Sequence, residues 1–283
     1  MSEPVTAAKC GALLDALRVK KPLVHFITNY VTVNDCANIT LAVGGAPVMS
    51  DQPDDAAEIC RLASALVFNI GTPGDRTLEA MLRAGKAANE AGIPVVLDPV
   101  GAGASSFRNR LLEKLLEEVK FAAVKGNISE IRFLASGTGK SMGVDASKDD
   151  IALGSDSSAV ARLAAGLSRG IGAVVIVSGR IDVAADGERA YGISNGDAMM
   201  GRLTGTGCMG SGVVASFLGA APGEPLASAI AGMCVMGLAG ELARKKLAPS
   251  SGTGTYRTIL MGEVSCMTGS VLENGVRLSQ IVL

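Results

Sequence analysis

Histidine and the large aromatic residues are scarce in this sequence. It contains one histidine, His25, and no tryptophan, and aromatic residues make up only 3% of the chain. A single histidine excludes zinc sites built from several histidines, and it makes any Ser-His-Asp triad depend on this one residue. Because His25 lies in an apolar run of strand length, we expect a structural side chain. The core must be filled mainly by Ala, Val, Leu, Ile and Met, which suits helices packed closely on a sheet.

The chain has no excess of positive charge and no closely spaced cysteine pairs. Its formal net charge is −1, which leaves no surplus of cations for a nucleic acid or an anionic membrane, and we expect neither as a partner. The six cysteines occur without any C-x-x-C pair. We expect buried free thiols in a reducing cytosol, which predicts a cytoplasmic protein.

Long apolar segments are missing as well. The longest run, 226–240, has about 15 residues, whereas a helix needs about 20 to cross a bilayer. The first 19 residues lack the apolar core of a secretory signal. We therefore expect a soluble protein. No change of composition divides the sequence, so we expect a single domain over residues 1–283.

Strand and helix patterns alternate along most of the chain. Apolar runs of strand length occur at 23–28, 47–50, 65–70, 94–99, 121–125 and 173–179. Strands that alternate with helices predict an α/β fold with a mostly parallel central sheet flanked by helices. The pattern then changes to a polar-edged antiparallel hairpin through Asp186-Gly187. Two largely buried helices should follow, at 206–220 and 225–246.

Three glycine-rich stretches raise the question of a phosphate-binding loop. The first, 132–143, contains Lys140 and Ser141 as in G-x-x-x-x-G-K-[ST], but Leu134 stands where this motif needs its first glycine. A helix pattern also leads into it, whereas a P-loop follows a strand. We therefore expect no P-loop here, and the segment 136–158 is either a mobile lid or a solvated loop.

The other two stretches precede helices. Stretch 250–256 has the composition of an ordinary helix-capping turn. Stretch 202–212 places several free backbone N–H groups at one helix N-terminus, where Gly205 and Gly207 would let an anion approach closely. Cys208 falls in the first turn, where we expect the helix dipole to lower its pKa. Either a phosphate site or a tight strand-to-helix turn accounts for this pattern.

Polar residues also follow two of the predicted strands. Asp98 ends one buried strand, and a glycine-rich turn comes after it; Lys125, Asn127 and Glu130 follow the next. The carboxyl ends of parallel strands are where α/β sheets bind ligands. Asn127 can instead cap the following helix. Carboxylates, a lysine, an asparagine and an anion site at one edge favour a magnesium nucleotide over acyl-transfer chemistry.

The sequence resembles the hydroxyethylthiazole kinase family from about residue 10 to the C-terminus. The resemblance rests on the order of HFITNYVTVNDCAN, APVMS, LDPVGAG, VKGNISE, IVSG and TGTGC. It implies a ribokinase-like fold and a homotrimer with active sites between subunits. It also implies Mg²⁺- and ATP-dependent phosphorylation of the hydroxyl of 4-methyl-5-(2-hydroxyethyl)thiazole, a step of thiamine salvage.

The resemblance assigns a thiazole pocket to Asn29, Met49 and Gly205, with Gly205 at the hydroxyl end. Met49 can also be read as core filler. Cys208 occupies the position of the aspartate base of wider ribokinase-like relatives, so we expect a weak base there; a small apolar filler is the alternative reading.

The resemblance assigns the nucleotide to five residues, Lys125, Asn127, Ser178, Thr206 and Gly207. Lys125 stands where the family usually has an arginine, and a lysine offers a point charge without a bidentate fork. Ser178 stands where a threonine is common, and its hydroxyl still offers a hydrogen bond. Asp98 and Glu130 correspond to the acids that organise magnesium.

Other functions remain open at this stage. A related kinase could act on a pyrimidine or a sugar alcohol, with a different pocket around Asn29 and Met49. The superfamily also includes ADP-dependent dehydratases of hydrated nicotinamide cofactors. If Asp98, Glu130 or the glycines of the 202–212 stretch were missing, the sequence would favour a non-catalytic nucleotide-binding sensor. All of these residues are present.

Overall fold

The computed structural model describes residues 3–137, 154 and 156–283. Over these residues the chain forms a nine-stranded sheet in the order β2-β1-β3-β4-β5-β6-β7-β8-β9. The strands are β1 (Leu23–Ile27), β2 (Ala46–Met49), β3 (Ala65–Asn69), β4 (Val95–Asp98), β5 (Ala123–Asn127), β6 (Val174–Ser178), β7 (Asp182–Ala185), β8 (Ala190–Ile193) and β9 (Leu278–Ile281).

Strands β1 to β6 pair in parallel, and β7, β8 and β9 extend the sheet in antiparallel pairs. All six apolar runs form strands within two residues of the expected bounds, and the hairpin forms from β7 and β8. The α/β fold is therefore confirmed. Strand β9 was not predicted, because two of its four residues are exposed and none is fully buried at this edge of the sheet.

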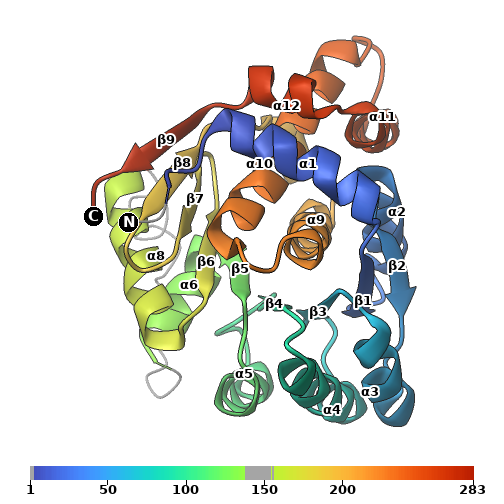
Figure 1. Cartoon of the computed structure of the whole chain (residues 1–283), viewed down its shortest axis with the longest axis vertical. Coiled ribbons are helices and arrows are strands. Elements are labelled where there is room, and N and C mark those ends of the chain that lie inside the picture. Colours follow the sequence, from blue (N-terminus) through green and yellow to red (C-terminus); the bar gives the residue numbers. More distant parts are fainter. Residues whose placement is uncertain (1–2, 138–153, 155) are drawn as a thin grey trace.

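Helices cover both faces of the sheet (Figure 1). One face carries α1 (Ala7–Lys20), α2 (Val33–Val43), α9 (Thr206–Ala220), α10 (Pro225–Lys246), α11 (Thr253–Cys266) and α12 (Gly269–Gly275). The other carries α3 (Pro53–Leu62), α4 (Asp75–Ala91), α5 (Ser106–Glu118), α6 (Ile128–Ala135) and α8 (Ser157–Ile171). Each set packs its apolar side chains into a separate core layer against the sheet.

The longest apolar helix is α10, whose bounds confirm the helix expected at 225–246; it corrects the expectation that no apolar segment is long enough to cross a bilayer. It has 22 residues and is apolar enough, by length and composition, to cross a membrane, although its uninterrupted apolar run is shorter. Within the fold, 89% of its most apolar window is buried. It packs against α9, α11 and α1. Its hydrophobicity is therefore that of a core helix.

Two of the glycine-rich stretches can be compared with the structure. The third begins α11 at Thr253 as expected, but Gly252 occupies the N-cap position and offers no side chain to cap the helix. The first begins inside α6, which ends at Ala135, so a helix does lead into it as expected. Lys140 and Ser141 lie outside the described residues, so the lid or loop reading stays a prediction. Its expected end was too late, because α8 already begins at Ser157.

The thiols and His25 were mostly placed correctly by the sequence. All six cysteines are free, but Cys266 is exposed and Cys208 only half-buried. His25 is fully buried, and its Nε2 lies 2.9 Å from the Ser50 carbonyl oxygen. Burial lowers the pKa of His25, and its Nδ1 has no partner among the described residues. The expected burial of His25 is confirmed, whereas only one of its ring nitrogens has a partner among the described residues, so its structural role stays a prediction.

Candidate active site

The ends of the central parallel strands bring polar side chains to one edge of the sheet. Asn69 ends β3 and is paired in register with Asp98 at the end of β4. Asn127 ends β5 and is paired with Ser178 at the end of β6. Because these four strands are adjacent and parallel, their carboxyl ends form one continuous edge, the usual ligand-binding edge of an α/β sheet.

The turn at the start of α9, formed by Gly205, Thr206 and Gly207, faces this edge, and we call it the glycine turn. Gly205 is its N-cap residue, with φ 89°, a left-handed conformation that favours glycine. The first backbone hydrogen bond of the helix runs from the Met209 amide to the Gly205 carbonyl, 2.8 Å. The amides of Thr206, Gly207 and Cys208 precede that bond, and these are the groups that a helix N-terminus offers to an anion.

A connected set of polar groups lies where the turn meets the strands. The Asn69 amide nitrogen donates to Asp98 Oδ2 at 2.8 Å and to Cys208 Sγ at 3.2 Å. The Asn29 amide nitrogen donates to Asn69 Oδ1 at 2.8 Å and to Cys208 Sγ at 3.5 Å. The Ser211 hydroxyl donates to Asp98 Oδ2 at 2.9 Å. We call these five residues the Asp98 cluster; it joins the expected substrate side to the expected metal side.

The Asp98 cluster corrects the expected acidity of Cys208. Burial raises the pKa of the Cys208 thiol, and the charge of Asp98 raises it further. Hydrogen bonds from Thr32, Asn69 and Asn29 act in the opposite direction but do not reverse the shift. The pKa of Cys208 is therefore raised, and not lowered as its place in the first turn of the helix had predicted, so the thiol is held protonated.

Asp98 and Glu130 are the two acids of the predicted magnesium site. Burial raises the pKa of Asp98, opposed by the charge of Lys125 and by its hydrogen bonds. Burial also raises the pKa of Glu130, and the Asp98 charge contributes to the rise. A buried and a half-buried acid whose ionisation is disfavoured are a suitable environment for a divalent cation, which would stabilise both charged forms.

The remaining contacts define what kind of metal these acids fit. Glu130 accepts from the Gly101 and Asn127 amides at 3.0 and 2.8 Å. Among the described residues, no group of three or more His, Cys, Asp or Glu side chains could hold a metal ion. Magnesium is usually held by one or two carboxylates together with substrate phosphates. The residues therefore fit a magnesium that arrives with a nucleotide.

Asn127 has the structural role that its position also allowed. Its side chain accepts from the Glu130 amide at 2.9 Å, and the Glu130 side chain reaches back to the Asn127 amide in a capping box. This arrangement starts α6 and fixes the direction of the Glu130 side chain. Asn127 does not line the cavity described next.

Four of the five residues assigned to the nucleotide line one cavity of about 490 Å³, namely Lys125, Ser178, Thr206 and Gly207. Lys125 is buried, and its Nζ donates to the Gly207 carbonyl at 3.0 Å. The rest of the wall comes from the turn after β6, the segment after β8 and one side of α10. A larger cavity of about 850 Å³ lies between the N-terminal segment and the start of α10, and it contains none of the predicted site residues.

The residues assigned to the thiazole are only partly brought together. Thr32 donates from its amide and its hydroxyl to Asn29 Oδ1, at 3.0 and 3.1 Å. A Cβ on Gly205 would lie 2.7 Å from Thr32 Cγ2, so Thr32 links Asn29 to the glycine turn. Met49 ends β2, the edge strand of the sheet, where it is half-buried and packs against the apolar core. The place of Met49 in the pocket therefore stays a prediction.

The sequence reasoning missed Asn69 and Asp182. Asn69 was the penultimate residue of a predicted strand, so its place at the carboxyl end was available as a signal. Asp182 lines the cavity, and its Oδ1 accepts from the Gly179 amide at 2.8 Å. Burial raises the pKa of Asp182 to about 6, moderated by that bond and by Lys125. Nothing in the local pattern distinguished Asp182 from an exposed hairpin residue.

The chain is similar to the proteins of one family over most of its length. The sequence model of the Hydroxyethylthiazole kinase family matches residues 14–269. Hydroxyethylthiazole kinase of Clostridium beijerinckii is 45% identical over 273 residues, which cover 96% of this chain and 98% of that protein.

Solved structures agree with this assignment. The structure of hydroxyethylthiazole kinase protein from Pyrococcus horikoshii has a TM-score of 0.84 and 32% identity, covering 96% of this chain and 99% of that chain. A ribokinase-like superfamily protein from Enterococcus faecalis has a TM-score of 0.57 at 10% identity, covering 94% of this chain and 92% of that chain, and shares the fold. The predicted ribokinase-like fold is confirmed, and the chain belongs to the hydroxyethylthiazole kinase family.

Proposed function

We propose that the chain transfers a phosphoryl group from ATP to the hydroxyl of 4-methyl-5-(2-hydroxyethyl)thiazole, in thiamine salvage in the cytoplasm. The observation that carries this proposal is the position of the glycine turn. It lies between the Asp98 cluster and the 490 Å³ cavity that Lys125, Ser178 and Thr206 line. An alcohol held by the cluster would meet a phosphate held at the start of α9. The names of the relatives identify the alcohol.

Charge stabilisation and alignment carry most of a phosphoryl transfer. Lys125 supplies a buried positive charge next to the glycine turn, and the amides of Thr206, Gly207 and Cys208 supply donors for the transferred group. A magnesium ion held by Asp98 and Glu130 would neutralise phosphate charge. Asn29, fixed by Thr32 and Asn69, would orient the substrate at the edge of the turn.

Cys208 is the proposed proton acceptor, and it is a weak one. Its thiol is held protonated, so only the small fraction that has first released its proton to water, leaving the thiolate, can accept the alcohol proton. The amide donors of Asn29 and Asn69, at 3.5 and 3.2 Å from Sγ, are placed to stabilise that charge. We therefore assign Cys208 a contribution of about ten- to a hundredfold in turnover.

The proposal includes a homotrimer with active sites at subunit interfaces. Large apolar side chains are exposed on this part of the chain: Tyr30 and Val31, which follow Asn29 in the sequence, are 80% and 59% exposed, and Leu41 on α2 is 58% exposed. Such residues are typical of a surface that a second copy covers. Light scattering of a dilution series, read together with activity, tests this: a fully active monomer would contradict it.

One assay decides between this function and the others. ATP consumption is measured across a panel of thiazole, pyrimidine and sugar alcohols, with and without magnesium. We expect turnover with hydroxyethylthiazole and a magnesium requirement. Faster turnover of a pyrimidine or sugar alcohol would reassign the substrate. ATP binding without turnover of any alcohol would favour a sensor.

A further inference from the structure

Helix α10 carries one acidic residue, Glu241, next to its buried part. Two glycines precede it on the helix: a Cβ on Gly237 would lie 2.8 Å from Asn195 Cβ, and a Cβ on Gly240 would overlap Met200 Sδ. Asn195, Met200 and Gly237 all line the 490 Å³ cavity. This side of α10 therefore lies directly against the wall of that cavity.

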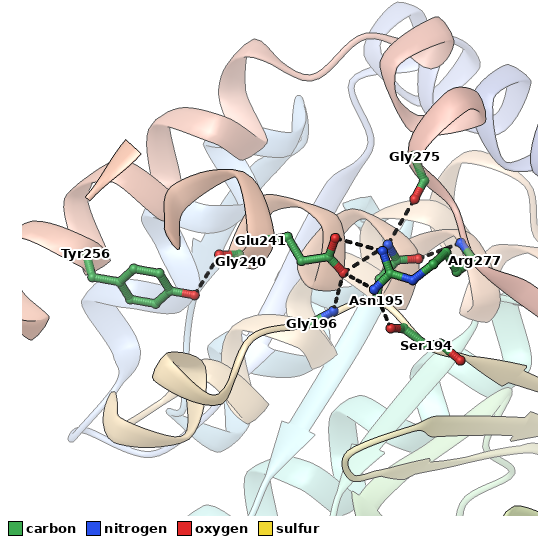
Figure 2. A network of polar contacts seen from close by, with 8 residues as sticks. All are labelled: Ser194, Asn195, Gly196, Gly240, Glu241, Tyr256, Gly275 and Arg277. Carbon is green, nitrogen blue, oxygen red and sulfur yellow. Dashed lines mark hydrogen bonds and ion pairs between the residues drawn. The ribbon is translucent and has the colours of Figure 1, made fainter. Parts of the chain in front are cut away.

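Glu241 binds two other parts of the chain at once (Figure 2). Its Oε1 accepts from the Gly196 amide at 2.8 Å and from the Asn195 side-chain amide at 3.2 Å. Arg277 donates to both carboxylate oxygens, at 2.5 and 2.9 Å, which is a bidentate ion pair. Burial acts to raise the pKa of Glu241, but these partners outweigh it and hold the pKa below its ordinary value.

The segment before β9 completes the network. The Arg277 amide donates to Asn195 Oδ1 at 2.7 Å, and its guanidinium donates to the Ser194 carbonyl at 2.6 Å. The Asn195 side chain also donates to the Gly275 carbonyl at 2.9 Å. Figure 2 shows the side chains of Glu241, Asn195 and Arg277 converging on one point from three different parts of the chain.

Glu241 binds the loop at Asn195 and Gly196, and the glycine gives this loop a wide choice of backbone conformations. It follows β8, and Gly196 has φ 139°, with no described atom within 4 Å of the place that a Cβ would take. A glycine in this conformation gives the backbone wide freedom. Ordering such a wall before the ligand arrives removes an entropic cost from binding.

We propose that Glu241 is a positioning residue for the nucleotide, which fixes the cavity wall at Asn195 and Gly196 and is itself held by Arg277. This inference rests on the proposed function, in which ATP occupies the 490 Å³ cavity. Glu241 does not line the cavity and acts through the two residues that do. The C-terminal segment thereby contributes to nucleotide affinity although it is remote from the glycine turn in sequence.

The test compares Glu241→Ala with Glu241→Gln. We expect the alanine variant to raise the KM for ATP about tenfold, with kcat and the KM for the thiazole within about twofold of the parent chain. The glutamine variant should show a smaller rise, because its amide oxygen still accepts from the Gly196 amide while the ion pair is lost. Arg277→Ala should raise the KM for ATP as well, and less than additively when combined with Glu241→Ala.

A matched control exists at the end of the same helix. Lys246 on α10 pairs with Glu263 on α11 at 2.6 Å, and neither residue lines the cavity. Glu263→Ala removes another carboxylate ion pair of α10, made with a lysine, and it should leave the KM for ATP unchanged. If Glu241→Ala does not fold, the KM for ATP of Glu241→Gln and of Arg277→Ala is compared with that of Glu263→Ala instead.

Three outcomes would overturn the inference. A lower melting temperature with an unchanged KM for ATP would show a purely structural role. Equal increases of this KM in both Glu241 variants would show that the hydrogen bond to the Gly196 amide does not hold the wall. A change in the KM for ATP that is the same in Glu241→Ala and Glu263→Ala would show that Glu241 has no specific effect on the cavity wall.

Calorimetric titration with Mg-ATP separates this inference from the proposed function. If the parent chain binds no ATP, the proposed function fails. Binding that Gly207→Val abolishes and Glu241→Ala leaves intact refutes the role of Glu241 only.

Discussion

Replacing Gly205 by alanine tests how the glycine turn is coupled to the substrate side of the site. The residue has φ 89°, and placing an L-residue in the left-handed region costs about 1–2 kcal/mol. The new Cβ would also lie 2.7 Å from Thr32 Cγ2. Thr32 must then move, which weakens its two hydrogen bonds to Asn29, each worth about 1 kcal/mol. Backbone strain and weakened hydrogen bonds together should lower the free energy of unfolding by about 2–4 kcal/mol.

The chain offers a control that has the same backbone strain without the contact. Gly92, at the C-terminus of α4, has φ 69°, and no described atom lies within 4 Å of an added Cβ. Gly92→Ala should lower the free energy of unfolding only by the cost of the left-handed backbone, about 1–2 kcal/mol. Turnover should be unchanged.

Denaturant unfolding and steady-state kinetics of the two variants decide the matter. We expect Gly205→Ala to be the less stable variant and to lose at least about tenfold in kcat/KM for the thiazole, because Asn29 is displaced. Equal stability and equal turnover in the two variants would refute the coupling through Thr32.

The buried ionisable groups lead to three more predictions. Asp98→Asn or Glu130→Gln should each raise the magnesium concentration needed for half-maximal turnover without unfolding the protein, as followed by circular dichroism; an unchanged magnesium dependence in both would contradict the proposed metal site. Cys208 should react with iodoacetamide more slowly than the exposed Cys266 at pH 7, because burial raises its pKa, and peptide mass spectrometry that finds the reverse order would reveal a thiolate. The pKa of Asp182 rises from 3.8 to about 6 on folding, so the folded state binds more protons in this range and stability should fall as pH rises from about 4 to 6. Asp182→Asn should remove that part of the pH dependence of the unfolding free energy, and an unaltered profile would disprove the assignment.

Individual residues of the candidate site could be predicted from the sequence more readily than the hydrogen bonds that join them. Asp98, Lys125 and the glycine turn were found because strand ends and helix N-termini have local signatures in the sequence. Asn69 joins Asn29, Asp98 and Cys208, yet its own neighbours in the chain give only a strand. Its role depends on the register of β3 against β4, which local patterns do not specify.

The sequence by itself determined the six parallel strands and their order along the chain, the hairpin after β6 and the glycine-rich start of α9. These follow from the period of apolar residues and from glycine's freedom at positive φ, which are properties of neighbouring residues. Tertiary structure alone decided the protonation of Cys208, since desolvation and the nearby Asp98 charge come from packing. It also decided the partnership of Glu241 and Arg277, 36 residues apart. Burial and long-range contacts depend on how distant elements meet, and no local pattern contains that information.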